Sequence, residues 1–292
     1  MKYSIENELL KVTVTTEGAQ ICSVKRKCDN VEHIWQADPA LWAKHGPILF
    51  PYPSRIRGGF LTIKGKQYPA DIHGFAKNME HSLVSQNENT VVLELKTSRE
   101  SLALWPYEFR LVSTFTLEGD TLHHTLTVEN PGDEDMQFGI GYHPGFAVPF
   151  DDNHVATDYE LRFDCIESPL CLKSSADGRF GETTYVLGHN IDTIPLDEHL
   201  FDNDSHCMVA LKSHTLGLYE KDTGRGVVCG IKGFPYTLIW SKPGMPKFVC
   251  IEPWHSLPSP ENGSIKWDEK PAAAVLQPGE AWSCTLSTSF VR

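Results

Sequence analysis

Hydrophobic and polar residues alternate with a period of two along much of this chain. In the segment 10–14, every second residue is Leu or Val, and the segment 91–95 repeats the pattern. Such alternation is typical of a β-strand that buries one face and exposes the other. We therefore expect strands to make up most of the fold.

The clearest hairpin is predicted over residues 109–130. Hydrophobic residues occupy alternate positions up to Leu117, Glu118-Gly119-Asp120 forms the turn, and the alternation resumes from Leu122. Turn residues between two alternating runs are typical of an antiparallel hairpin. Further hairpins are predicted at 216–231, turning at Asp222-Thr223-Gly224, and at 60–68, turning around Lys64-Gly65-Lys66.

Helical signals are few. Residues 37–46 could form one short helix, with Asp38 as N-cap, Pro39 in the first turn and Gly46 as the stop. Short helical turns are also expected at 98–105 and 196–201. No repeat or low-complexity linker divides the chain, and 22 glycines and 19 prolines fall largely between the strands. The pattern predicts an all-β fold, one large antiparallel β-sandwich domain over residues 1–292 with a few short helices.

Composition narrows the classes of partner. The formal net charge of −12 disfavours nucleic acid and anionic membranes. No apolar run approaches the roughly 18 residues of a membrane span, and the N-terminus lacks a signal-peptide pattern. We expect a cytoplasmic protein, a monomer or homodimer, whose eight cysteines are mostly reduced and buried because none forms a CxxC pair.

Two strand-like runs each bring an ionisable residue directly before a proline. FGIGYHPGF carries His143-Pro144, and FVCIEPW carries Glu252-Pro253. A residue before proline is held in extended backbone, and proline cannot continue a central ladder, so we expect each run to end there. A histidine and a carboxylate held in this way can act as acid and base in one reaction.

The surroundings of these two residues support the interpretation. Gly139 and Gly141 share a face with His143, which suggests a surface that something approaches closely. Glu252 shares a face with apolar residues near Trp254, which would raise its pKa as a general base requires. The simpler alternatives are a strand-end histidine bonded to a backbone carbonyl, and a glutamate that reaches solvent or pairs with an arginine.

Two more stretches carry candidate binding residues. GPILFPYPSRIRGG contains Arg55 and Arg57, and ADIHGFAKN contains His73 and Lys77. Arginine and histidine can hydrogen-bond sugar hydroxyls or stabilise developing negative charge. Surface salt bridges and a loop histidine are equally compatible with the pattern. HxH and HExxH spacings are missing, so no metal site is expected, and GxSxG, GxGxxG and P-loop motifs are missing too.

The ordered motifs resemble the aldose 1-epimerase (galactose mutarotase) family, closest to its LacX-like branch. The resemblance runs through GAQICSVKRK, EHIWQADPALW, GPILFPYPSRIRGG, HGFAKN, GIGYHPGF, FPYTLIWSKPG, IEPW and LQPGE, across nearly the whole chain. It implies the large β-sandwich of that family, called a supersandwich. It also implies interconversion of the α- and β-anomers of a hexose such as galactose or glucose, with no cofactor.

The resemblance implies a role for each matching residue. Glu252 in IEPW matches the general base, and His143 in GYHPGF matches the general acid. His73 in HGF and Arg55 in SRI match substrate-binding positions. The family's acidic binding residue corresponds to the stretch PLDEHLFDND, where Asp197 or Glu198 could serve. Trp240 or Trp254 could stack on a pyranose, and core packing is the alternative use of these side chains.

Two alternatives stay open at the level of sequence. Arg55, Arg57 and Lys77 could together hold a phosphate, which would make the substrate a hexose 6-phosphate. The same fold could also serve a non-catalytic sugar-binding protein, because fold alone does not establish activity.

Overall fold

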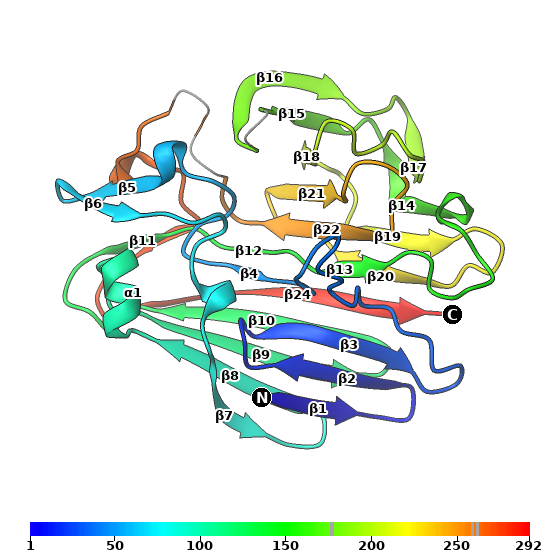
Figure 1. Ribbon diagram of the computed structural model, residues 1–292, viewed down its shortest axis with the longest axis horizontal. Helices are drawn as coiled ribbons and strands as arrows, with labels where there is room; N and C mark the ends of the chain where they lie inside the picture. Colours follow the sequence, from blue (N-terminus) through cyan, green and yellow to red (C-terminus); the bar gives the residue numbers. More distant parts are fainter. Residues whose placement is uncertain (176–177, 258–259, 261–262) are drawn as a thin grey trace.

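The computed structural model describes residues 1–175, 178–257, 260 and 263–292, which form mainly antiparallel strands (Figure 1). Nine strands build the first large sheet, in the order β17-β14-β19-β20-β24-β10-β9-β8-β7. Their bounds are β7 Ser82–Gln86, β8 Thr90–Lys96, β9 Arg110–Glu118, β10 Thr121–Glu129, β14 Tyr159–Glu167, β17 Ile191–Pro195, β19 Thr215–Glu220, β20 Gly226–Gly230 and β24 Ala281–Val291.

The second large sheet has eight strands. Its order is β16-β15-β18-β21-β22-β12-β4, and β13 also pairs with β22. Their bounds are β4 Ile48–Leu49, β12 Gly141–Tyr142, β13 Gly145–Ala147, β15 Leu170–Ser174, β16 Phe180–Val186, β18 His206–Val209, β21 Tyr236–Trp240 and β22 Phe248–Trp254.

Smaller elements surround these sheets. A three-stranded sheet contains β1 Lys2–Glu6, β2 Leu10–Thr15 and β3 Gln20–Arg26, while β5 Phe60–Ile63 pairs with β6 Lys66–Pro69 and β11 Met136–Phe138 pairs with β23 Ala274–Leu276. The helices are α1 Arg99–Leu104 and the 3-10 turns η1 Arg57–Gly59, η2 Ala76–Asn78, η3 Ala156–Asp158 and η4 Trp267–Glu269. In the described part of the chain, helices are all too short to cross a bilayer.

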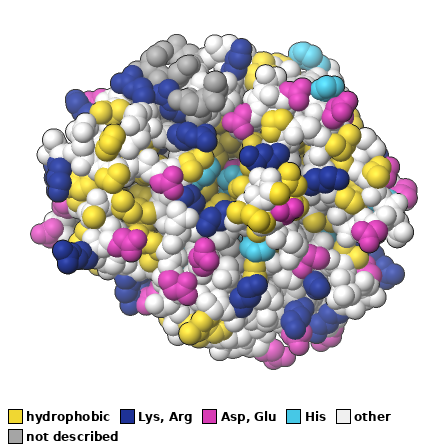
Figure 2. Space-filling model, in the orientation of Figure 1, with side chains coloured by type: hydrophobic (Ala, Val, Ile, Leu, Met, Phe, Trp, Pro, Cys, Tyr) yellow, Lys and Arg dark blue, Asp and Glu magenta, His cyan; other side chains and the backbone are white. Residues whose placement is uncertain are grey.

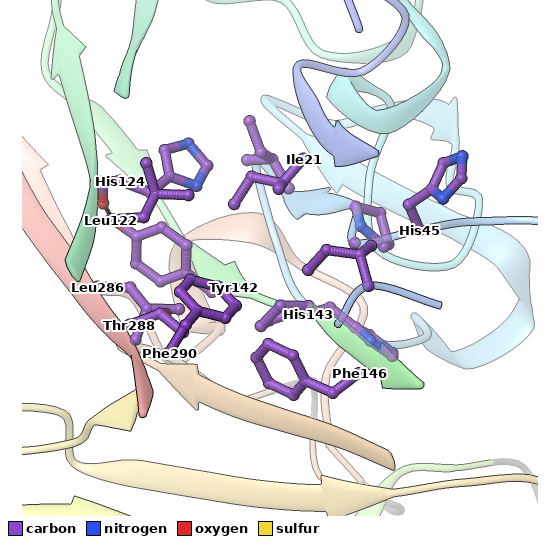
Figure 3. A pocket seen from close by; sticks show the side chains of 15 residues that line it. Ile21, His45, Leu122, His124, Tyr142, His143, Phe146, Leu286, Thr288 and Phe290 are labelled. Atoms are coloured by element: carbon purple, nitrogen blue, oxygen red, sulfur yellow. Dashed lines mark hydrogen bonds between the residues drawn. The ribbon is translucent and has the colours of Figure 1, made fainter. Parts of the chain in front are cut away.

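The main core lies where the two large sheets face each other. A small cavity of about 20 Å³ lies in this layer, and Figure 3 shows the side chains that line it. Leu122 and Leu286 line it from the nine-stranded sheet, and Phe146 lines it from the eight-stranded sheet. The hydroxyl of Tyr142, on β12, donates to the carbonyl of His124, on β10, at 2.7 Å. This bond links the two sheets next to His143.

Alternation in β21 and β22 divides their side chains between two environments. Ile239 and Ile251 belong to the main core, whereas Leu238 and Cys250 belong to two smaller clusters on the opposite face. Every residue of β22 is nevertheless buried, because loops and aromatic side chains cover that opposite face. Glu252 shares the face of Cys250, so the strand directs a carboxyl group into a covered region outside the main core.

The predicted hairpins are confirmed as β9–β10, β19–β20 and β5–β6, all antiparallel. The helix at 98–105 is confirmed as α1, where Ser98 is the N-cap and its side chain accepts from the amide of Ser101. Residues 196–201 form turns instead of a helix. Five of the eight cysteines are buried, and all eight are free thiols.

Two sequence predictions are wrong in detail. Residues 37–46 form an irregular loop, in which the amides of Leu41 and Trp42 both bond the carbonyl of Asp38 and no further turn follows. The side chain of Trp42 instead packs against the cluster on the outer face of the eight-stranded sheet. The strand β22 also continues through Pro253, which stays paired with Thr237, because a proline removes only one donor from the ladder.

Candidate active site

A hollow of about 350 Å³ opens on the outer face of the eight-stranded sheet. This volume falls in the range of small-molecule sites, about 300–1,000 Å³. Figure 2 shows a depression near the middle of this face, with histidine atoms inside it and Lys and Arg side chains around it. The lining residues are Trp42, Lys44, Pro47, Ser54, Arg55, Ile72, His73, Lys77, His143, Gly178, Phe180, Asp204, Ser205, Leu238, Trp240, Lys242, Glu252 and Trp254.

The two predicted proton-transfer residues meet at this hollow. Glu252 lies within β22, and His143 lies between β12 and β13, next to β22 in the same sheet. Nε2 of His143 is 3.3 Å from Oε2 of Glu252, and the two side chains are 7% and 2% exposed. Sheet pairing therefore brings together two residues that are distant in sequence.

The predicted close approach to the two glycines is made by the protein itself. A Cβ at Gly139 would lie 2.3 Å from Oγ of Ser256, and one at Gly141 would lie 2.5 Å from Cδ1 of Trp254. Both distances are too short for any side chain. Because neither glycine has a side chain, Trp254 and Ser256 can pack against them. This allows β22 to lie close to the segment that carries His143.

Burial disfavours charge on both members of the pair. It raises the pKa of Glu252 well above its usual value, and the negative charge of Asp204 raises that pKa further. Burial also lowers the pKa of His143 to about 3. Without a ligand, the pair is therefore most stable when it is uncharged, with a proton on Glu252 and a neutral imidazole.

Aromatic rings enclose the imidazole of His143. The indole of Trp42 lies against it at 5.0 Å between centroids and 29° between planes, whereas Trp240 meets it at 5.5 Å and 81°. His73 approaches from another direction, at 5.3 Å and 89°. These rings exclude water from His143, which is the physical cause of its lowered pKa.

His73 is held in one tautomer by Ser54. The amide of Ser54 donates to Nδ1 of His73 at 2.9 Å, and the amide of His73 donates to the carbonyl of Ser54 at 2.7 Å. Because Nδ1 accepts, the ring proton lies on Nε2. Burial, followed by the charges of His143, Lys77 and Arg55, lowers the pKa of His73 well below its usual value, so the ring is neutral.

The backbone of this loop is unusual. Ser54 and His73 both have positive φ angles, 56° and 62°. Gly74 follows with φ 68°, and a Cβ there would lie 2.2 Å from the carbonyl oxygen of Phe50. Strained backbone of this kind is found preferentially at functional sites, where the surrounding structure holds it.

The charged groups of the hollow have both signs. The carboxyl groups are those of Asp204 and Glu252, and the cationic groups are those of Lys44, Arg55, Lys77 and Lys242. Lys77 is 6% exposed, and its Nζ lies 2.7 Å from the exposed carboxylate of Asp71. Lys44 lies 3.7 Å from the exposed Glu17. The hollow thus carries more cationic than anionic groups, in a protein with a net charge of −12.

Seven residues singled out in the sequence line the hollow, namely Arg55, His73, Lys77, His143, Trp240, Glu252 and Trp254. Asp197, Glu198 and Arg57 do not. Oδ1 of Asp197 accepts the amides of His199 and Leu200, at 2.8 and 2.9 Å, as in a turn. Glu198 is exposed beside His199, and Arg57 is exposed in η1.

The acidic residue that does reach the hollow is Asp204, the last residue of the stretch PLDEHLFDND. Asp197 and Glu198, the two candidates predicted from this stretch, stand seven and six positions before it. Of the stretch, only Asp204 lines the hollow, directly before Ser205 and the start of β18 at His206. Trp42, Lys44, Ser54 and Lys242 had no signal of their own, because each lies in a loop whose path depends on tertiary packing.

Among the residues that the structure describes, two side-chain clusters have donor atoms close enough for a metal ion. They are His143, Cys250 and Glu252, and Asp151, His154 and Glu220, each with ligand atoms within 4.8 Å of one another. Nη2 of Arg225 lies 2.8 Å from Glu220 and also bonds Asp151, so a guanidinium already neutralises the second cluster. The first contains the buried contact between His143 and Glu252.

Comparison with known proteins agrees with this architecture. Residues 1–289 match the family model for aldose 1-epimerase. The plasmid-encoded protein LacX of Lactococcus lactis subsp. lactis is 32% identical over 94% of this chain and 95% of its own length. A galactose mutarotase related enzyme from Lactobacillus acidophilus has a TM-score of 0.94, 27% identity, and coverage of 100% of this chain and 98% of its own.

A galactose mutarotase-like protein from Lactobacillus casei gives a TM-score of 0.90, at 25% identity and 99% coverage of both chains. The fold and the hollow thus define a galactose mutarotase-like β-sandwich. The chain belongs to the aldose 1-epimerase family.

Proposed function

We propose that the protein is an aldose 1-epimerase, which interconverts the α- and β-anomers of a hexose such as galactose or glucose. The observation that carries the proposal is the buried contact between His143 and Glu252 on the floor of a sugar-sized hollow. In a pyranose, O1 and the ring oxygen O5 are both bonded to C1. An acid and a base that serve these two oxygens must therefore lie side by side, as this pair does.

Ring opening begins with the proton of the pair on His143. The carboxylate of Glu252 takes the proton of the C1 hydroxyl, C1–O1 becomes a carbonyl, the C1–O5 bond breaks, and His143 gives its proton to O5. Atoms and electrons balance, so no cofactor is required. Each positioned proton transfer contributes roughly 10²–10⁴-fold to the rate.

Ring closure starts from the state that ring opening leaves behind. Glu252 then holds the proton and His143 is neutral, which is the form that burial favours in the empty site. Rotation about C1–C2 presents the other face of the carbonyl. O5 then attacks C1, His143 takes the O5 proton back, and Glu252 protonates O1, which gives the opposite anomer.

The remaining groups are proposed to hold the sugar. His73 offers its Nε2–H as a donor because Nδ1 is already occupied by Ser54. Arg55 and Asp204 can bond hydroxyl groups, and Trp240 can contact the apolar face of the ring. Such contacts keep C1 beside the acid–base pair, which is a large part of the rate gain in enzymes of this kind.

Polarimetry of freshly dissolved α-D-galactose and α-D-glucose tests the proposal. We expect the protein to accelerate the approach to anomeric equilibrium, and Glu252→Gln and His143→Asn to remove most of that acceleration. A rate equal to that of buffer would instead favour a non-catalytic sugar-binding protein. Full activity in Glu252→Gln would refute the assignment of the base.

A second candidate substrate is a hexose 6-phosphate. It is favoured by the cationic side chains Lys44, Arg55, Lys77 and Lys242 of the hollow. The exposed Arg57 is not part of this set, so the phosphate would be held without it. Comparing the rates at which the protein interconverts the anomers of galactose and of galactose 6-phosphate decides between the two substrates. A preference for the phosphorylated sugar that is lost in Lys77→Met would support the hexose 6-phosphate.

A further inference from the structure

The imidazole of His143 stacks against an aromatic ring that has no role in the reaction proposed above. It lies nearly parallel to the indole of Trp42, with 5.0 Å between ring centroids and 29° between ring planes. The face of an indole carries negative charge density and attracts a cation placed over it. A neutral imidazole gains much less from this face than a protonated one.

The position of Trp42 is fixed from two sides. Nε1 of Trp35 donates to the carbonyl of Trp42 at 2.8 Å, and the ring of Trp42 stacks on Phe248 at 5.2 Å and 21°. The amide of Gly145, two residues after His143, donates to the carbonyl of His45 at 2.9 Å. The loop 37–46 and the segment that carries His143 are therefore tied together, and the two rings are held in register.

Apart from the carboxylate of Glu252, the surroundings of His143 leave a protonated ring with little support. The ionisable groups that contact it or lie next to it are Glu252 and Cys250 on β22 and the neutral His73. In the described residues, its Nδ1 is buried without a hydrogen-bond partner. The other charged groups lining the hollow are Lys44, Arg55, Lys77, Lys242 and Asp204.

We propose that Trp42 is a positioning residue whose indole face stabilises the protonated form of His143 and so enables His143 to donate its proton to the sugar. The inference rests on the proposed function, because ring opening starts with that proton on His143. It goes beyond that function because it names the residue that stabilises the protonated form of the acid. That residue lies in the irregular loop 37–46. Trp42 acts through His143.

Two variants test this by their pH–rate profiles. Trp42→Leu removes the aromatic face, and Trp42→Phe keeps a weaker one. A cation over an aromatic face in a desolvated site is worth about 1–2 kcal/mol, equivalent to about 5- to 30-fold. We expect kcat to fall by about this factor in Trp42→Leu, the acid limb of the profile to move down by about one pH unit, and Trp42→Phe to be intermediate.

A structural or substrate-stacking role would give a different result. KM would then rise while the acid limb stayed at the same pH, and an unmoved acid limb in both variants overturns the proposal. Trp282→Phe is the matched control, since its indole also contacts a histidine, His255, at 4.8 Å and 87°, but lies outside the hollow. That variant should keep the wild-type profile.

Fluorescence provides a readout that needs no turnover. A protonated imidazole quenches a stacked indole more strongly than a neutral one does. We expect a pH-dependent quenching step that is lost in both Trp42→Phe and His143→Asn and is retained in Trp282→Phe. A step that survives in His143→Asn would refute the coupling. If the wild type showed no mutarotation, the proposed function would fail, and this fluorescence experiment would still decide the role of Trp42.

Discussion

Ser54 and His73 exchange two hydrogen bonds across the hollow's edge. The amide of Ser54 donates to Nδ1 of His73, and the amide of His73 donates to the carbonyl of Ser54. Oγ of Ser54 also donates to the carbonyl of Gly178 at 2.7 Å, which joins a third segment to the same point. The ring of His73 is thereby fixed in its tautomer and in its orientation toward His143.

We expect His73→Asn to raise KM by about 3- to 10-fold with a small effect on kcat. The change removes one hydrogen bond to the sugar, worth roughly 0.5–1.5 kcal/mol, and Asn tolerates the positive φ of this position. Initial rates over a range of sugar concentrations measure the effect. In the wild type, KM should show no titration near pH 6.5, because the pKa of His73 lies well below that value. A KM that changes through pH 6.5 and becomes flat in His73→Asn would contradict the neutral assignment.

Asp204 and Asp197 give a matched pair of substitutions within one segment. Asp204→Asn removes the charge that helps to raise the pKa of Glu252, so the limb of the pH profile that reports Glu252 should move to lower pH, and KM should rise. Asp197→Asn keeps an oxygen that can accept the amides of His199 and Leu200 and should leave the kinetics unchanged. If only Asp197→Asn changed the kinetics, the role of acidic binding residue would belong to Asp197 and not to Asp204.

Three buried histidines predict loss of stability in acid. Burial lowers the pKa of His33 and His81 to about 4 and that of His124 to about 3. Above pH 6.5 these rings are neutral in both the folded and the unfolded states. Below pH 6.5 the unfolded chain binds protons that the folded protein does not, so each histidine lowers the free energy of unfolding by about 1.4 kcal/mol per pH unit down to its folded pKa.

Urea unfolding at a series of pH values measures this slope. His124→Leu should reduce it by one proton, because the ring of His124 stacks on Phe115 at 4.2 Å and, in the described residues, its Nε2 has no hydrogen-bond partner. An unchanged slope in this variant would mean that His124 is protonated in the folded state.

The ion-pair network around Glu220 should be important for stability. The carboxyl group of Glu220 is fully buried and bonds Arg225 at 2.8 Å, Thr223 at 2.5 Å and the hydroxyl of Tyr159. Burial by itself would raise the pKa of Glu220, but these hydrogen bonds outweigh it and lower the pKa. The network therefore stabilises the fold above pH 4.5, and its contribution is lost as the pH falls through the folded pKa.

Arg225→Met removes the guanidinium beside the buried charge of Glu220, which then faces the imidazole of His154 at 3.3 Å. We expect the free energy of unfolding at pH 7 to fall by about 3–5 kcal/mol, the usual cost of breaking a buried pair from one side. The double variant Arg225→Met with Glu220→Gln should recover part of this loss. If Arg225→Met alone had no effect in urea unfolding, the network would contribute nothing to stability.

Local sequence patterns predict most of the strands and single out both residues of the buried His143–Glu252 contact. Period-two alternation is a local property, so the hairpins β9–β10, β19–β20 and β5–β6 could be predicted from short segments. The prolines after His143 and Glu252 mark two residues that the fold brings within 3.3 Å of each other, even though β22 does not end at Pro253. The order of the motifs indicated the family.

Only the tertiary structure decided which loops surround the hollow. Asp204 lines the hollow and Asp197 does not, and Lys44 lines it whereas Arg57 does not. Trp42 packs against His143. These placements all depend on loop paths that no short-range sequence pattern encodes. The burial that shifts the pKa values of Glu252 and His143 in opposite directions is likewise a property of packing between distant segments. The periodicity of side chains can be seen in neighbouring residues, so strands can be predicted locally. The environment of a titratable group is formed by residues that are distant in the chain, so it depends on the tertiary structure.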